Sequence, residues 1–380
     1  MKNLFGVVII VLLGFFSIGI PLAVLPGHVR DHLILGNTLI GIVIGLQSLV
    51  TLLTRHFAGV IADSKGARAA VGRGIMLLII SGSLTLVSLQ LHGNSALLFL
   101  LIGRMVLGAG ESLLITGALA WGIGLVGPAK TGRVMAWSGM AMYAAIAASA
   151  PVANLIGEHF GFSFILASAI LFPSVAGIVS VFIPPTPAIG GGRMPFYEVL
   201  DRVWKPGVGL ALSAVSFVGL AGFAALLFKE RGWANASLVM TFFGAAYIAA
   251  RLLFASTPDK FGGKNVALVS LALAAAGQAM LFLAETPLWA FAGSVLTGFG
   301  YSLTFPSFGV EAVKSVETQF KGVALGAYVA FFDLSLAVTA PLAGFIAGNF
   351  SYSAVYLFGL LSCAAAFVLA LQIQKPKEAA

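Results

Sequence analysis

A short signature that occurs twice, half a chain length apart, constrains the fold of this chain more than any other feature. The first copy, Arg55 to Arg68, reads RHFAGVIADSKGAR, and the second, Arg251 to Lys264, reads RLLFASTPDKFGGK. An arginine, an aspartate, a glycine and a final basic residue recur in one register, each 196 positions later. Each copy ends one apolar run and precedes another. The repeat predicts two related bundles of membrane helices, an arrangement typical of transporters.

The composition indicates that nearly the whole chain lies in a membrane. Of its 380 residues, 59% are hydrophobic and 9% are charged, whereas a soluble domain carries about 25% charged residues. The single cysteine, Cys363, excludes an intramolecular disulfide and a cysteine-based metal site. The five histidines lack metal-ligand spacing, so we expect no metal. No phosphate-binding loop or Ser-His-acid grouping is visible, which argues against an enzyme, a primary pump and a bound cofactor.

Apolar runs predict the helices and their grouping. A helix needs about 20 residues to cross the hydrocarbon core, and the runs between polar breaks number twelve. The long break from Pro184 to Pro206 predicts a linker between two six-helix halves. We therefore expect an all-α membrane protein with two pseudo-symmetric bundles, residues 1–183 and 206–380, joined by a cytoplasmic linker at 184–205. The expected segments are 4–26, 37–62, 70–90, 96–126, 133–156, 161–183, 206–228, 235–257, 265–284, 287–313, 321–347 and 350–372.

The basic residues predict the orientation. Fifteen Lys and Arg residues fall in the loops and termini of one side, and three fall on the other. Because cytoplasmic loops are enriched in basic residues, both termini are expected in the cytoplasm of a bacterial inner-membrane protein. Since the net charge of +8 is spread over these loops, we expect no nucleic-acid partner. The first run, about 4–25, is long enough to be a retained helix and not a signal peptide.

Further landmarks match between the halves with a second offset. Gly108 recurs as Gly298, Ala150-Pro151 as Ala340-Pro341 and Gly132 as Gly322, each 190 positions later. The second half is therefore about six residues shorter near its third and fourth segments.

With these features the chain resembles the major facilitator superfamily over essentially its whole length, closest in style to the proton-coupled drug and sugar-efflux branch. The run Gly59 to Arg68 resembles the family's loop motif between helices two and three. This resemblance implies a latch that holds the outward-facing state; an ordinary basic cytoplasmic loop is the alternative. The latch residues would be Gly59, Asp63, Gly66, Arg68, Asp259 and Lys264.

The fourth segment carries charges inside the membrane. Arg104 and Gly108 resemble the family motif in which a buried arginine assists proton coupling. Glu111 lies seven residues after Arg104, on the same helix face and about 10 Å away, which is long for a direct bridge. A charge at this depth costs about 3 kcal/mol or more, so it should face a cavity or a partner. We expect Glu111 to accept the coupled proton; a structural ion pair is the alternative.

Three further charges lie within apolar segments. Asp333 follows Lys321 by twelve residues, about 18 Å along a helix, and so lies near the middle of the membrane. It is either a second proton-coupling residue or the partner of a cationic substrate group, or else it bonds neighbours such as Ser335. Arg55 and Arg251 lie about 12 Å from the inner boundary, where we expect them to snorkel or to pair with inner-face groups.

The fifth segment and the aromatic residues bear on the substrate. The segment around Pro151 resembles the helix-five motif of proton-driven exporters, although alanines replace most of its glycines. Small residues still allow close packing. The resemblance to exporters favours export over uptake, although the alanines weaken this argument. Polar and aromatic side chains could line a largely apolar cavity suited to an amphipathic or weakly polar solute. The candidates are Gln47, Trp121, Tyr143, Asn154, Tyr247, Tyr301 and Tyr328.

The sequence thus predicts a secondary active transporter that works by alternating access. We expect proton-coupled efflux of a small organic or amphipathic compound, driven by the proton gradient and performed by a monomer. The alternative is a proton symporter or facilitator for uptake of a sugar-like or organic solute, because the fold does not fix the direction.

Overall fold

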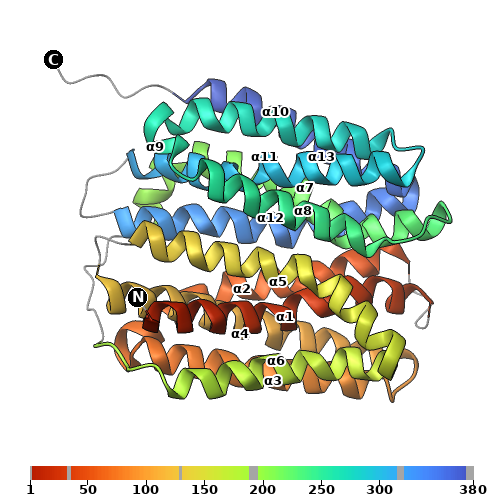
Figure 1. Cartoon of the computed structure of the whole chain (residues 1–380), viewed down its shortest axis with the longest axis horizontal. Helices are drawn as coiled ribbons and strands as arrows, with labels where there is room; N and C mark the ends of the chain where they lie inside the picture. Colours follow the sequence, from red (N-terminus) through yellow and green to blue (C-terminus); the bar gives the residue numbers. More distant parts are fainter. Residues whose placement is uncertain (1, 32–35, 128–130, 188–195, 315–320, 374–380) are drawn as a thin grey trace. The chain divides into compact units, whose positions relative to one another are not determined.

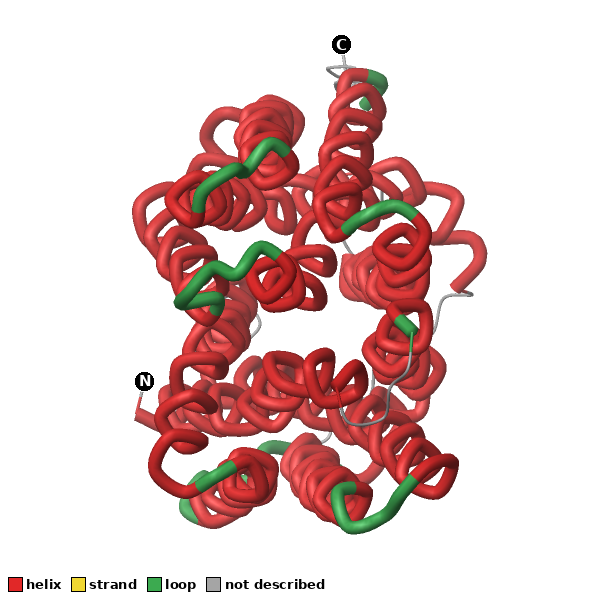
Figure 2. The backbone as a smooth tube through the Cα atoms, turned by 90° about the vertical axis from the view of Figure 1, so that its right-hand side faces the viewer, coloured by secondary structure: helices red, strands yellow, loops and turns green. Residues whose placement is uncertain are grey.

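The computed structural model describes residues 2–31, 36–127, 131–187, 196–314 and 321–373. Over these residues all regular secondary structure is helical (Figure 2). The chain divides into two compact units, Met1–Gly191 and Gly192–Ala380. The boundary falls inside the predicted linker, of which residues 188–195 lie outside the described residues.

Unit 1 is built from six long helices (Figure 1). The third and fourth helices pack closely, as do the second and fourth. The helices are α1 (Lys2–Asp31), α2 (Asn37–Lys65), α3 (Ala67–Ser88), α4 (Gly93–Val126), α5 (Thr131–Phe160) and α6 (Phe162–Val181).

Unit 2 repeats this pattern with one short additional helix, α9, which lies in the second copy of the signature. The pairs α10 with α11 and α8 with α11 correspond to the close pairs of unit 1. The helices are α7 (Phe196–Glu230), α8 (Ser237–Phe254), α9 (Thr257–Phe261), α10 (Gly263–Phe282), α11 (Pro287–Lys314), α12 (Lys321–Asn349) and α13 (Tyr352–Leu371).

Eleven of the helices in the described residues are long and apolar enough to cross a membrane. The remaining long helix, α11, has 28 residues. Four of its hydroxyl residues, Ser294, Thr297, Ser302 and Thr304, are fully buried within unit 2. These polar residues lower the hydropathy of α11, but they do not face lipid because they are buried. Their hydroxyl groups donate hydrogen bonds to backbone carbonyls.

Small residues set the closest helix contacts in both units. A Cβ on Gly74 of α3 would lie 2.7 Å from the Leu114 nitrogen of α4. In unit 2 a Cβ on Gly300 of α11 would overlap the Ser270 carbonyl of α10. Gly300 follows Gly110 by 190 positions and Ser270 follows Gly74 by 196, so the two offsets meet at equivalent helix contacts. Backbones approach this closely only where side chains are absent or small.

One pair of equivalent glycines in the two signature copies, Gly66 and Gly262, forms the turns between helices. Gly66 joins α2 to α3 with φ 90° and ψ 149°, and Gly262 joins α9 to α10 with φ 85° and ψ 140°. Residues with a Cβ rarely adopt this conformation. The repeat therefore preserves a backbone requirement as well as a charge pattern.

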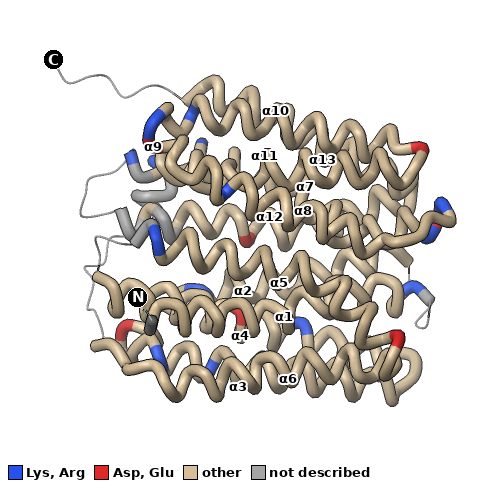
Figure 3. Tube along the Cα trace, viewed as in Figure 1, with Lys and Arg blue, Asp and Glu red and all other residues tan. Residues whose placement is uncertain are grey.

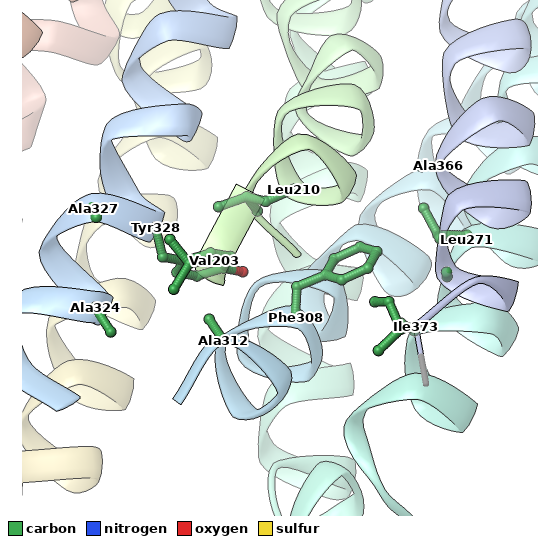
Figure 4. Packing of buried hydrophobic residues seen from close by; sticks show 12 residues of the cluster. Val203, Leu210, Leu271, Phe308, Ala312, Ala324, Ala327, Tyr328, Ala366 and Ile373 are labelled. Atoms are coloured by element: carbon green, nitrogen blue, oxygen red, sulfur yellow. The ribbon is translucent and has the colours of Figure 1, made fainter. Parts of the chain in front are cut away.

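Apolar side chains fill each unit and also cover much of its outer surface. Figure 4 shows the main core cluster of unit 2, with the Phe308 ring near its centre and Leu210 of α7 beside it. Large side chains such as Leu253 and Phe182 are exposed, at 71% and 81%, as expected for surfaces that meet lipid. Charged residues gather mainly at helix ends, and few interrupt the helices (Figure 3).

Part of the predicted linker is helical. Helix α7 begins at Phe196 and continues through Pro206 to Glu230, so residues 196–205 belong to unit 2. Pro206 does not end the helix. Over residues 184–187 the chain has no helix, and α6 ends at Val181.

Candidate functional site

Helices α2 and α4 touch where α4 carries Gly108. A Cβ on this glycine would overlap the carbonyl oxygen of Gln47 and lie 3.0 Å from the Val50 side chain. The absence of a side chain at Gly108 therefore allows the two backbones to meet. This contact places the next turn of α4, which carries Glu111, against α2.

Glu111 is held by two polar side chains of α2. The Gln47 amide donates a hydrogen bond to Oε2 of Glu111 over 2.7 Å, and the Thr51 hydroxyl lies 3.2 Å from the same oxygen. The Thr51 hydroxyl also lies 3.0 Å from each of two carbonyl oxygens, those of Gln47 and Gly108. Since a hydroxyl has one proton, it can donate to the carboxylate or to a carbonyl, but not to both at once.

Arg104 is hydrogen-bonded to α2 at Val43, one helical turn before Gln47. Its Nε donates to the Val43 carbonyl over 3.0 Å, and its side chain is 2% exposed. Within the described residues Arg104 forms no ion pair with Glu111, in agreement with the seven-residue spacing, and its Nη1 has no hydrogen-bond partner. Val43, Gln47 and Thr51 recur every four residues, so one face of α2 contacts all of these α4 groups.

The positive charges near Glu111 come from two helices. Arg104 of α4 and Arg55 of α2 both act electrostatically on its carboxylate. Gln47, Thr51, Arg55 and Arg104 thus surround one acid within unit 1. Gln47 and Thr51 can hydrogen-bond the Glu111 carboxyl group in either of its protonation states, because an amide and a hydroxyl each offer a donor and an acceptor.

Unit 2 builds the equivalent contact with different side chains. A Cβ on Gly298 of α11 would overlap the Phe243 carbonyl of α8, as Gly108 approaches Gln47. The Tyr301 ring lies 6.1 Å from Phe243, 6.2 Å from Tyr247 and 5.8 Å from Phe217. An aromatic cluster therefore replaces the polar one. The pairs of equivalent positions are Gln47 and Phe243, Thr51 and Tyr247, Arg55 and Arg251, and Glu111 and Tyr301.

Arg251 is buried against Tyr247 of this aromatic cluster, so of the two alternatives, snorkelling and pairing, it does not snorkel. Its side chain is 7% exposed, its Nη2 donates to the Tyr247 hydroxyl over 2.8 Å, and its guanidinium carbon lies 5.5 Å from the centre of that ring. The Ser302 hydroxyl fixes the backbone beneath it by donating to the Tyr247 carbonyl over 2.8 Å. Snorkelling does not occur because the Tyr247 hydroxyl and ring hold the guanidinium inside unit 2.

Two predicted residues of α12 are also buried in unit 2. The Tyr328 hydroxyl donates to the Phe305 carbonyl over 2.7 Å, and the Arg251 charge and Tyr301 act on it electrostatically. Asp333 is 4% exposed. The Ser335 hydroxyl, which the sequence offered as a partner of Asp333, donates instead to the Ala211 carbonyl of α7.

The final basic residue of each signature copy binds the end of the last helix of its own unit. Arg68 Nη2 donates to the Val181 carbonyl over 3.2 Å. Lys264 Nζ donates to the carbonyls of Leu371 and Ile373 over 2.6 and 2.8 Å. Leu371 follows Val181 by 190 positions, so the interaction itself is repeated. A cation at a helix C-terminus satisfies unpaired carbonyls and the helix dipole.

The acids of the signature copies lie at the surface of their units. Asp63 is exposed in the last turn of α2, and Asp259 is exposed in α9. A Cβ on Gly59 would meet no atom within 4 Å, so Gly59 is not required for a close contact inside unit 1.

Two residues of the polar contacts were missed by sequence reasoning. Thr51 could have been found from its spacing of four after Gln47. Glu311 accepts a hydrogen bond from the Lys264 backbone over 3.2 Å and pairs with Lys314 over 3.0 Å. Its signal was an acid three residues before a lysine at a helix end.

The predicted cavity residues separate into different environments. Trp121 is fully buried and its Nε1 donates to the Pro184 carbonyl over 2.8 Å. Tyr143 is buried and Asn154 is exposed, both on α5. Gln47 joins Glu111, whereas Tyr247, Tyr301 and Tyr328 gather near Arg251. Over the described ranges, no three His, Cys, Asp or Glu side chains form a group that could hold a metal ion.

Comparisons with known proteins agree with this architecture. The family model described as Major Facilitator Superfamily matches residues 7–234 and 207–380. An uncharacterized MFS-type transporter of Pseudomonas aeruginosa is 43% identical over 372 residues, 97% of this chain and 92% of the relative. One of Burkholderia pseudomallei is 43% identical over 358 residues, 93% and 88% of the two chains.

Solved structures share the fold at low sequence identity. The nucleoside transporter NupG superposes with a TM-score of 0.79 at 13% identity, covering 98% of this chain and 100% of that one. The human organic anion transporter MFSD10 (TETRAN) superposes with a TM-score of 0.74 at 15% identity, covering 97% and 99%. The two repeated helical units, the apolar spans and these matches lead to one conclusion: the chain belongs to the Major Facilitator Superfamily of membrane transporters.

Proposed function

We propose that this transporter exports a small organic or amphipathic compound in exchange for protons, with Glu111 as the proton-coupling residue. The observation that supports this proposal is the pair of α2 donors on Oε2 of Glu111, at 2.7 and 3.2 Å. When Glu111 is protonated on this oxygen, it can donate to Thr51, whose own proton then goes to the Gly108 carbonyl. Either protonation state therefore keeps its hydrogen bonds while the charge of the α2–α4 contact changes.

Alternating access gives this charge change a function. In this mechanism the two halves rock about a central binding site, and any ligand or proton that favours one state shifts the population toward it. Protonation of Glu111 removes the charge that attracts Arg55 and Arg104. Asp333, buried in α12, is the second proton-coupling candidate. The proposed setting is a monomer in the bacterial inner membrane with both termini in the cytoplasm.

The direction of coupling can be measured in proteoliposomes with imposed pH gradients. Three probes cover different chemistry: uridine, benzoate and the amphipathic cation ethidium, with protein-free liposomes correcting for passive diffusion. An exchanger accumulates its substrate in an acidic lumen, whatever the orientation of insertion, because protons leave as substrate enters. A proton symporter accumulates it when the outside medium is acidic, and a facilitator accumulates it under neither gradient.

The residue assignment is tested with Glu111→Gln and Asp333→Asn in the same vesicles. We expect Glu111→Gln to abolish gradient-driven accumulation while it retains counterflow, the exchange of labelled for unlabelled substrate without a gradient. Full gradient-driven accumulation by both variants would show that proton coupling lies elsewhere.

A further inference from the structure

Unit 2 contains a buried positive charge at the position where unit 1 has a charge beside an acid. Arg55 and Arg251 are equivalent residues of the repeat, 196 positions apart. The charge of Arg55 acts on the Glu111 carboxylate. The residue equivalent to Glu111 in unit 2 is Tyr301, which is neutral. The repeat has therefore kept the arginine and replaced the carboxylate with a phenol.

The surroundings of Arg251 do not compensate its charge. Its guanidinium contacts Tyr247, through the hydrogen bond and the ring face. Among the described residues it has no ion pair with an Asp or Glu, and its Nε is buried without a hydrogen-bond partner. An arginine side chain does not lose its proton in a protein. A buried charge without a counter-charge is unfavourable, and an anion bound beside it would supply one.

The groups around Arg251 suit an anion with a flat apolar body. A guanidinium presents several donors in a plane and matches a carboxylate geometrically. The Tyr247 hydroxyl accepts a hydrogen bond from Arg251. This bond polarises the hydroxyl and makes it a stronger donor to a bound anion. Next to these donors lies the aromatic cluster, in which the Tyr301 ring is stacked on Phe217 at 5.8 Å and lies 6.1 Å from Phe243, so the surroundings of the donors are apolar and aromatic.

We propose that Arg251 and Tyr247 bind the anionic group of the transported compound, and that the aromatic cluster receives its ring. The substrate class is then a small aromatic or apolar carboxylate. This inference rests on the proposed transport function and adds the chemistry of the cargo. It also assigns the two repeats different tasks: unit 1 handles the proton at Glu111, and unit 2 handles the anion at Arg251.

The test is equilibrium binding to the purified full-length protein in nanodiscs without a pH gradient. Benzoate, benzamide and benzylammonium have the same ring and differ in charge. We expect calorimetry to show benzoate binding at least tenfold tighter than the other two. Arg251→Gln should weaken benzoate binding at least tenfold, and Arg251→Lys should weaken it less because the charge remains. Lys260→Gln, which removes an exposed cation of α9, is the charge-matched control and should bind as the unmodified protein does.

Two results would overturn the inference: no preference for benzoate over benzamide, or unchanged benzoate binding by Arg251→Gln. If Arg251→Gln does not fold, Tyr247→Phe provides the test, because it keeps the ring and removes only the hydroxyl. It should weaken benzoate binding several-fold and leave benzamide binding unchanged; equal binding of benzoate would again contradict the site. The binding measurement uses no pH gradient, so it does not depend on proton coupling in the vesicle experiment. Conversely, proton coupling can be observed in vesicles even if benzoate does not bind.

Discussion

The Gln47 amide donates to Oε2 of Glu111 over 2.7 Å, and this bond joins α2 to α4 at the level where Gly108 lets the two backbones meet. The Glu111 carboxyl group therefore lies where the backbones of α2 and α4 are in close contact. A change in its protonation would change the charge at this helix contact. The consequences can be measured at individual residues.

Thr51 is predicted to serve Glu111 through its hydroxyl group and not through its size. Thr51→Val has the same shape without the hydroxyl, so it should slow gradient-driven accumulation several-fold in the vesicle assay. Thr51→Ser keeps the hydroxyl and should transport within about twofold of the unmodified rate. Equal transport by the Val and Ser variants would remove Thr51 from the proton path.

The close approaches at Gly108 and Gly298 are predicted to be intolerant of any side chain. Gly108→Ala and Gly298→Ala place a methyl group on the facing carbonyls of Gln47 and Phe243. Overpacking of this kind costs about 1–3 kcal/mol, so each variant should lower the melting temperature in detergent. Gly72→Ala in α3 is the control, because a Cβ there meets no atom within 4 Å. A similar melting temperature for all three variants would contradict the assigned helix contacts.

The turn glycines Gly66 and Gly262 are predicted to be irreplaceable by asparagine as well as by alanine. Asparagine tolerates the left-handed helical region, where ψ is about 47°. The ψ values at these glycines are 149° and 140°, in a region that is almost restricted to glycine. Ala and Asn variants at Gly66 should therefore destabilise unit 1 by a similar amount, about 1–3 kcal/mol. Recovery by Asn in thermal melts would show that the turn has a different conformation.

Lys264 is predicted to hold the end of α13 through its two carbonyl contacts, at Leu371 and Ile373. Lys264→Gln should accelerate hydrogen exchange in the last turn of α13, since such caps contribute about 0.3–1 kcal/mol. Lys264→Arg keeps the charge and should protect this turn nearly as well. Mass spectrometry of the peptide covering the turn measures both. The first turn of α13, around Ser351, has its own side-chain cap to the Ala354 nitrogen over 3.1 Å and serves as the internal control.

The apolar runs alone were sufficient to predict the long helices, because a helix in lipid must satisfy its backbone internally. They did not predict the short α9. Proline was less informative: the sequence suggested that a helix begins at Pro206, whereas α7 begins at Phe196 and continues through this proline. The repeat predicted that Arg68 and Lys264 are equivalent. It could not show that both bind the end of the last helix of their unit, because the acceptors lie 113 and 107 residues away.

The site shows the same division between sequence and structure. The sequence by itself determined the fold, the duplication and the presence of charged residues inside the membrane, because these depend on local hydropathy and spacing. Only the tertiary structure decided their partners: Glu111 meets Gln47 and Thr51 of α2, and Arg251 lies buried against Tyr247. The physical reason is that the cost of a buried charge depends on the groups packed around it. Helix packing chooses those groups from distant parts of the chain.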